Sequence, residues 1–256
     1  MKILAIGDVV GKKALEHLAK NLWSIRDKLK IDLAVANGEN ASDIYGMSPS
    51  DAEIMLSHGV DLITLGNHAF SRKDVFSLLS DSQNIIRPAN YPPLAPGGGY
   101  TILNIDGWRI LGINVMGTAF MDSLACPFAT VDKILEREKG NYDFSIMDIH
   151  AESTSEKYAL GLYFDGRISM IFGTHTHVAT ADEQIFPNGS GYVTDIGMVG
   201  PKFSAIGADA KTVIERMRTK ISCRLPIADG EIEATGVVFD LDTSTKKVKS
   251  INRIKF

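Results

Sequence analysis

Two histidines, His175 and His177, lie one residue apart at the end of the apolar run "ISMIFGTHTH". In an extended segment, side chains at positions i and i+2 share a face and lie about 7 Å apart, from a rise of ~3.3 Å per residue. Each histidine would therefore reach a different metal ion of a pair that is typically ~3.5–4 Å apart. A lone histidine beside an apolar strand is more often an ordinary core or surface residue. A role for this pair in metal binding therefore depends on the residues at the ends of the other apolar runs.

Four further apolar runs also end in a carboxylate, a carboxamide or an imidazole. Any one of these residues is weak evidence, because Asp, Asn and Gly are common in the turns that come after strands. Their joint occurrence at successive strand ends makes coincidence a poor explanation. The residues are Asp8 after "KILAIG", Glu39 and Asn40 after "DLAVANG", Asn67 and His68 after "DLITLG", and His150 after "FSIMDI".

The donor atoms in this set are carboxylate oxygens, amide oxygens and neutral imidazole nitrogens, with no thiolate. Such donors suit a divalent transition metal such as Mn²⁺, Fe²⁺ or Zn²⁺ better than Ca²⁺ or a sulfur-bound structural zinc. The candidates are too many for one ion, so two divalent ions are expected, with Mg²⁺ a poorer match. Two protein carboxylates, two divalent ions and one bridging hydroxide leave about one net positive charge. That charge favours an anionic substrate without selecting a diester over a monoester.

The elements that must position these residues are short apolar runs alternating with helix-period stretches. Runs that are apolar throughout suit strands that are buried on both faces, as in parallel sheets. In open α/β sheets, ligands collect at the carboxyl ends of the strands, so residues about 170 positions apart can meet at one edge. The sequence therefore predicts an α/β fold. Three of its helices are expected over about 13–28, 131–138 and 155–162.

Two more helices and two hairpins have terminal signals of their own. In "SPSDAEIMLSHG", Ser48 is the expected N-cap, Pro49 takes the first helical position and Asp51 closes a capping box before the stop at Gly59. The stretch "SRKDVFSLLS" predicts a helix with Ser71 as its cap. The dipeptide at 106–107 predicts the turn of a hairpin in "YTILNIDGWRILGINVM". Another antiparallel hairpin is expected over 231–256.

Length and composition indicate a single layered domain. The 256 residues are ample for a buried core, and no internal repeat or convincing linker divides them, so 1–256 is expected as one domain. Lys and Arg number 27 against 31 Asp and Glu, a formal charge of −4. The chain therefore has no excess of basic residues that would indicate binding to a nucleic-acid duplex or a membrane surface. A short RNA-derived substrate remains compatible with this charge. Two distant cysteines, Cys126 and Cys223, fit free thiols in the cytoplasm, and the N-terminus resembles a first strand rather than a signal peptide.

At these residues the chain resembles the calcineurin-like metallophosphoesterases. The family pattern runs roughly GDxH, GDxxD, GNH[DE], a lone His and GHxH, and the corresponding segments are "GDVVG", "NGEN", "GNHAF", "DIHAE" and "GTHTH". Val10 replaces the first histidine of that pattern, Glu39 replaces the bridging aspartate, and no acid comes after His68. These departures are typical of the small bacterial YmdB-like branch, which "RPANYP", "HAESTSEKYALG" and "TDIGMVGP" also resemble. The resemblance implies mixed β-sheets sandwiched by helices (αββα).

The resemblance also implies roles for individual residues. It assigns a proton-donating role to His68, which would protonate the leaving alkoxide and bind no metal. A metal-bridging hydroxide would attack the phosphorus of a 2′,3′-cyclic nucleotide, and 3′,5′-cyclic nucleotides are a further expected substrate. The implied metal ligands are Asp8, Glu39, Asn40 and His177 for the first ion, and Glu39, Asn67, His150 and His175 for the second, with Glu39 bridging.

The surrounding loops leave more than one interpretation open. Tyr45, Phe120 and Phe128 are expected to stack on a base, Met198 to line the site, and Asp195 to support the ligands. A phosphomonoesterase or a nuclease would use the same metals. A regulatory protein that retains a metal site is an alternative of a different class. A homo-oligomer is an expected assembly, because such oligomers are common in the family.

Overall fold

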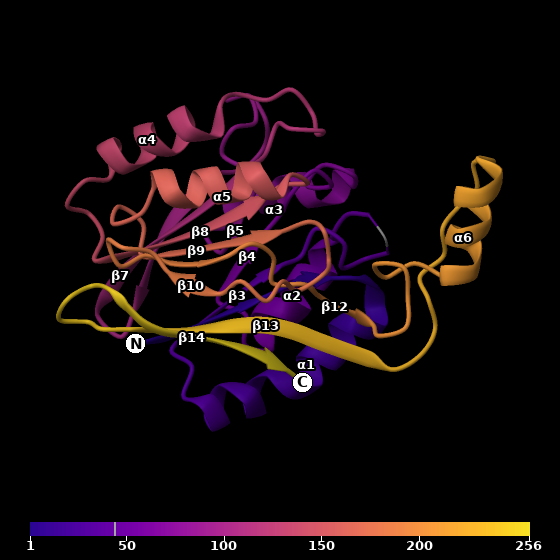
Figure 1. The fold of residues 1–256 in the computed structure, drawn as a ribbon, viewed down its shortest axis with the longest axis horizontal. Helices are drawn as coiled ribbons and strands as arrows, with labels where there is room; N and C mark the ends of the chain where they lie inside the picture. The colour runs from indigo at the N-terminus through magenta and orange to yellow at the C-terminus, as the bar shows by residue number, and fades with distance from the viewer. Residues whose placement is uncertain (44) are drawn as a thin grey trace.

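The computed structural model describes residues 1–43 and 45–256, and across these residues two β-sheets pack face to face with helices on both outer sides (Figure 1). The order of layers is helix, sheet, sheet, helix, which confirms the predicted αββα architecture. Strands near the N-terminus and the C-terminal hairpin share one sheet, and the middle of the chain forms the other.

One side of the larger sheet is parallel, with β1, β3, β4 and the edge strand β5 lying side by side. The hairpin of β13 and β14 joins it antiparallel to β1, and β12 links β13 to the short β2. The predicted C-terminal hairpin is thus confirmed. The strands are β1 (Lys2–Ile6), β2 (Asp8–Val9), β3 (Leu33–Asn37), β4 (Leu62–Thr64), β5 (Ile85–Ile86), β12 (Met198–Pro201), β13 (Ile232–Leu241) and β14 (Val248–Lys255).

The smaller sheet is also parallel at its centre, with an antiparallel strand at each edge. Its first hairpin turns at Asp106 and Gly107, whose φ angles of 50° and 85° suit the predicted two-residue turn. The strands are β6 (Tyr100–Ile105), β7 (Trp108–Met116), β8 (Phe144–His150), β9 (Met170–Thr174), β10 (Gln184–Ile185) and β11 (Gly191–Val193).

Strand β1 shows why its run is apolar throughout. Ile3 and Ala5 point between the two sheets, where they pack with Phe144 of β8. Leu4 and Ile6 alternate with them and point to the other face, against the helices. Both faces of the strand are therefore buried, as expected for a parallel strand between two layers.

Helices α1 (Gly11–Leu29), α2 (Pro49–Ser57) and α3 (Phe76–Asp81) cover the larger sheet. Helices α4 (Pro127–Arg137) and α5 (Thr154–Tyr163) cover the smaller one. The predicted start of α2 is confirmed, because the Ser48 side chain and Asp51 form a reciprocal capping box. Within the described residues, no helix is both long and apolar enough to cross a membrane.

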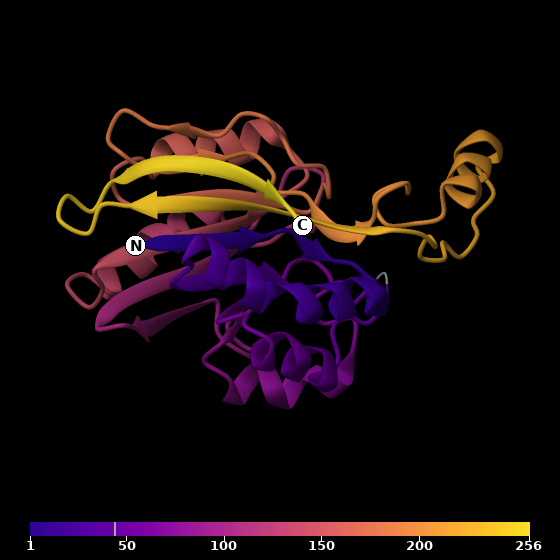
Figure 2. The ribbon, with the colours of Figure 1, turned by 90° about the horizontal axis from the view of Figure 1, so that it is seen from below.

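Two segments differ from the sequence-based prediction. Ser71 does not cap a helix: a 3₁₀ turn over Lys73–Val75 comes first, and α3 begins at Phe76. Helix α6 (Ala210–Thr219) was not predicted at all. None of its residues is buried, and it projects from the body of the molecule at the end of an arm (Figures 1 and 2).

Candidate metal centre

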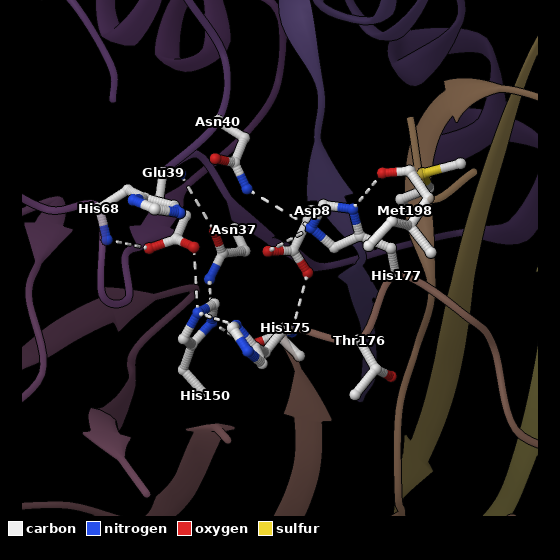
Figure 3. A network of polar contacts seen from close by, with 12 residues as sticks. Asp8, Asn37, Glu39, Asn40, His68, His150, His175, Thr176, His177 and Met198 are labelled. Carbon is white, nitrogen blue, oxygen red and sulfur yellow. Dashed lines mark hydrogen bonds and ion pairs between the residues drawn. The ribbon is translucent and has the colours of Figure 1, made fainter. Parts of the chain in front are cut away.

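The predicted polar residues meet at the carboxyl ends of strands from both sheets. Asp8 comes after β1, while Glu39 and Asn67 come after β3 and β4 of the same sheet. His150 ends β8 and His175 comes after β9, both in the smaller sheet. The residues were expected at the edge of one sheet, but the site is formed by the carboxyl ends of strands from both packed sheets (Figure 3).

One group of donors surrounds the His150 ring. Its Nε2 atom lies 3.0 Å from Glu39 Oε1, 2.9 Å from Asn67 Oδ1 and 3.1 Å from His175 Nδ1. The Glu39 and Asn67 oxygens can only accept, so either a proton on His150 Nε2 or a bound cation would satisfy this convergence. Gly66 makes room for it, because a Cβ atom there would collide with both His150 Nε2 and Glu39 Oε2. We call these four residues, Glu39, Asn67, His150 and His175, the His150 group.

A second group surrounds the His177 ring (Figure 3). Its Nε2 atom lies 3.4 Å from Asn40 Nδ2 and 3.6 Å from Asp8 Oδ1. Asp8 Oδ1 and Asn40 Oδ1 are buried and have no hydrogen-bond partner in the part of the chain that the structure describes. Buried oxygens are rarely left without a partner, so these two fit the ligands of a cation. We call these three residues the His177 group.

Hydrogen bonds behind the histidines fix which ring nitrogen faces the centre. Thr174 Oγ1 donates to Asp148 Oδ1 at 2.7 Å and lies 2.9 Å from His150 Nδ1. Its single hydrogen is committed to the carboxylate, so Thr174 accepts the Nδ1 hydrogen of His150. The Nε2 atom of His150 is then the one available to a metal.

The other two histidines have the same kind of support. His177 Nδ1 lies 2.9 Å from the backbone carbonyl of Ile206, which only accepts, so Nε2 faces Asp8 and Asn40. His175 Nε2 lies 3.1 Å from Glu152 Oε2, which leaves Nδ1 facing His150. Each histidine thus presents one nitrogen to the centre and uses the other to hold its orientation.

The pKa values show a centre that attracts positive charge. Burial disfavours an ionised Asp8, but His177 and its other partners lower its pKa to about 2. Burial likewise opposes a charged His177, yet Asp8 and other groups raise its pKa to about 9. Burial, with the nearby His150, lowers the pKa of His175 to about 4, so this ring is neutral at neutral pH. The donor set and its charge therefore fit divalent cations.

His68 lies beside the His150 group without joining it. Its backbone N–H donates to Glu39 Oε2 at 2.8 Å, and its ring Nε2 lies 3.1 Å from Asn67 Nδ2. The ring is half-buried, and burial lowers its pKa. Tyr45 covers it, with 4.4 Å between the ring centroids.

The other residues that were expected to touch substrate do not all lie close to the candidate metal centre. Tyr45 and Met198 lie close to the centre, and Met198 pairs with Asp8 in the sheet. Phe120 is 91% exposed in its loop. The Phe128 ring is not part of the candidate metal centre. It packs on Tyr163 and Phe164 at the end of α5, within the helix layer that covers the smaller sheet.

Several supporting residues were missed in the sequence. Asp148 and Thr174 lie inside or at the end of apolar strands and form the hydrogen-bonded layer under His150, and Asn37 at the end of β3 lies beside them. The signal for Asp148 was present, since a carboxylate within "FSIMDIH" is unusual in a buried strand. Glu152, by contrast, is expected from its place two residues after His150 to orient a ligand or a neighbouring loop, and its carboxylate lies against His175.

A buried ion pair holds the loop that carries the two histidines. Asp195 Oδ2 accepts from Lys157 Nζ at 2.7 Å and from the backbone N–H and hydroxyl of Thr176 at 3.2 and 2.7 Å. His175 and His177 have φ angles of 97° and 63°, in the left-handed region that is unfavourable for residues with a Cβ. Such a conformation costs about 1–3 kcal/mol and persists only when its surroundings impose it. Asp195 provides that restraint, in agreement with the supporting role expected for it.

We expect the Asp195→Asn variant to bind Mn²⁺ about 10–100-fold more weakly, because the loop loses the charged acceptor that orients both histidines. Equilibrium dialysis would measure the affinity, with a thermal melt to confirm folding. Asp61→Asn is the matched control, since that carboxylate pairs with Arg26 far from the loop. Unchanged Mn²⁺ affinity in a folded Asp195→Asn variant would show that the restraint is not needed.

Comparison with known proteins places this arrangement in a family. The family model described as "YmdB-like protein" matches residues 4–254. A 2′,3′-cyclic-nucleotide 2′-phosphodiesterase of Bacillus subtilis is 40% identical over 254 residues, which cover 99% of this chain and 96% of that protein.

Two solved structures are similar over the whole chain. A hypothetical protein from Thermus thermophilus superposes with a TM-score of 0.94 at 39% identity, covering 100% of this chain and 99% of that one. A novel phosphatase from Mycoplasma pneumoniae has the same TM-score at 33% identity, covering 100% and 93%. With its fold, its donor groups and its sequence in agreement over nearly its full length, the chain belongs to the YmdB-like family.

Proposed function

We propose that this protein is a metal-dependent phosphodiesterase that opens 2′,3′-cyclic nucleotides, using two divalent ions. The observation that supports this most strongly is the pair of donor groups. Oxygen atoms of Glu39 and Asn67 converge on His150, and the buried Oδ1 atoms of Asp8 and Asn40 beside His177 have no hydrogen-bond partner among the described residues. The Bacillus subtilis relative is named for the same reaction. We extend the proposal to 3′,5′-cyclic nucleotides as slower substrates.

The His177 group would hold one ion and the His150 group the other, with Glu39 shared between them. The donor types suit iron, manganese or zinc. When bound, such ions would lower the pKa of water enough to supply a hydroxide and would offset charge on the phosphoryl oxygens. The remaining steps fall to the side chains of this chain.

His68 would protonate the departing sugar oxygen. An alkoxide is a poor leaving group, so a positioned acid contributes about 10²–10⁴-fold to the rate. Glu39 and Asn67 fix its place through the backbone N–H and the ring Nε2. Burial lowers the pKa of the free His68 ring. An anionic phosphate close to the ring would raise that pKa and favour the protonated form that donates.

A turnover assay with four substrates tests this function. We expect Mn²⁺-loaded protein to hydrolyse 2′,3′-cAMP with a kcat/KM about tenfold or more above that for 3′,5′-cAMP, p-nitrophenyl phosphate and a short RNA without a cyclic end. Cleavage at the 2′ oxygen would give adenosine 3′-phosphate, which chromatography separates from the 2′ isomer. A phosphomonoesterase would prefer p-nitrophenyl phosphate and a nuclease the RNA. Negligible turnover of cyclic nucleotides would reject the proposal.

A further inference from the structure

A groove of about 590 Å³ lies beside the candidate metal centre, between the loop at Tyr45 and the chain that comes after α6. Tyr45 belongs to both places, because its ring lines the groove and lies 4.4 Å from the ring of His68. Ile227 forms another shared wall: its side chain fills the space where Gly11, three residues after Asp8, would carry a Cβ. A substrate with its phosphorus at the metals would therefore extend into this groove.

The groove is positively charged although the whole chain has a formal charge of −4. Its described walls include the guanidinium groups of Arg216 and Arg224 and one carboxylate, Asp43. Neither arginine takes part in an ion pair among the residues that the structure describes. Both side chains thus keep their planar sets of N–H donors available, which suit the oxygens of a phosphate.

Arg216 and Arg224 have no role in the proposed reaction when the substrate is a mononucleotide. A nucleoside 2′,3′-cyclic phosphate carries its single charge on the phosphate that the metals would hold. In an RNA strand that ends in a 2′,3′-cyclic phosphate, the ribose bears a second phosphate on its 5′ oxygen. That second phosphate is the group for which a basic groove next to the catalytic centre is suited, and the exposed Tyr45 ring offers a stacking surface for a base.

We propose that the groove binds the penultimate nucleotide of an oligoribonucleotide whose 3′ end is a 2′,3′-cyclic phosphate. This inference rests on the proposed function and narrows its substrate class. Arg216 and Arg224 bind the internal phosphodiester, and the groove volume lies within the range of about 300–1,000 Å³ usual for ligand pockets. Helix α6, which buries none of its own residues, thereby contributes Arg216 to the wall of this groove.

The test compares three substrates: adenosine 2′,3′-cyclic phosphate, the same compound with a 5′-phosphate, and the dinucleotide ApA with a terminal 2′,3′-cyclic phosphate. We expect the dinucleotide to exceed the mononucleotide about tenfold in kcat/KM, through charge-assisted contacts that weaken as salt is raised. In the Arg216→Gln/Arg224→Gln double variant that ratio falls to about one. Arg218→Gln is the matched control, because Arg218 lies on the same helix but lines a different cavity.

Each alternative outcome has a defined meaning. Equal kcat/KM for dinucleotide and mononucleotide, or a ratio unaffected by the double variant, overturns the inference. A 5′-phosphorylated mononucleotide that matches the dinucleotide also overturns it, since the groove would then recognise a terminal phosphate and no second nucleoside. Failure of the proposed function is distinguishable, because then none of the three cyclic substrates is turned over.

Discussion

The Glu39→Gln variant is expected to lose about a thousandfold or more in kcat/KM on 2′,3′-cAMP, because Glu39 is the carboxylate that we propose binds both metal ions. Glutamine keeps the size of the side chain and removes its charge. Burial opposes the ionisation of Glu39, but His150 and His68 lower its pKa, so the wild-type group is ionised. Bound Mn²⁺ should fall below two ions per chain at concentrations that saturate the wild type. Steady-state kinetics and equilibrium dialysis on the same preparation measure both effects.

Glu152→Gln is the matched control for that substitution. Glu152 lies 3.1 Å from His175 Nε2 but is outside both donor groups. A supporting hydrogen bond of this kind typically contributes about 10–100-fold, so its loss should be clearly smaller. Wild-type turnover together with two bound ions in the Glu39→Gln variant would show that Glu39 is not a ligand.

The second large effect is expected at His68. In the His68→Gln variant, kcat on 2′,3′-cAMP should fall about 10²–10⁴-fold while two metal ions remain bound, because we propose that the ring donates a proton and holds no metal. The same variant should retain most of its activity on bis(p-nitrophenyl) phosphate, whose leaving group departs without protonation. Comparing kcat for the two substrates isolates proton donation from general damage to the site.

Tyr45→Phe serves as the control for His68, since it keeps the ring that lies over the imidazole. Its kcat should remain within a fewfold of the wild type. An equal loss on both substrates in the His68→Gln variant, or the loss of bound metal, would contradict a role in proton donation.

The sequence was sufficient for the elements whose signals are local. Apolar runs such as "KILAIG" indicated strands buried on both faces, and Ile3 and Leu4 do face two different layers. The capping box of Ser48 and Asp51 and the turn at Asp106 and Gly107 are products of short-range chemistry. The candidate site was predictable for a related reason, since each donor lies at the end of a strand or within three residues after it.

The sequence was less informative where an outcome depends on tertiary contacts. Phe128 was expected near substrate, but its ring packs on Phe164, a neighbour that only the fold supplies. The layer of Thr174 and Asp148 beneath His150 depends on hydrogen bonds between strands far apart in the chain. Helix α6 has apolar residues at Val213, Ile214 and Met217 with helical spacing, a signal that was overlooked.

The central claim is that seven side chains hold two cations side by side, and a crystal grown with Mn²⁺ tests it most directly. Anomalous diffraction should show two peaks per chain, one among Asp8, Asn40 and His177 and one among Asn67, His150 and His175, about 3.5–4 Å apart with Glu39 between them. A single peak, or peaks away from these residues, would contradict the account.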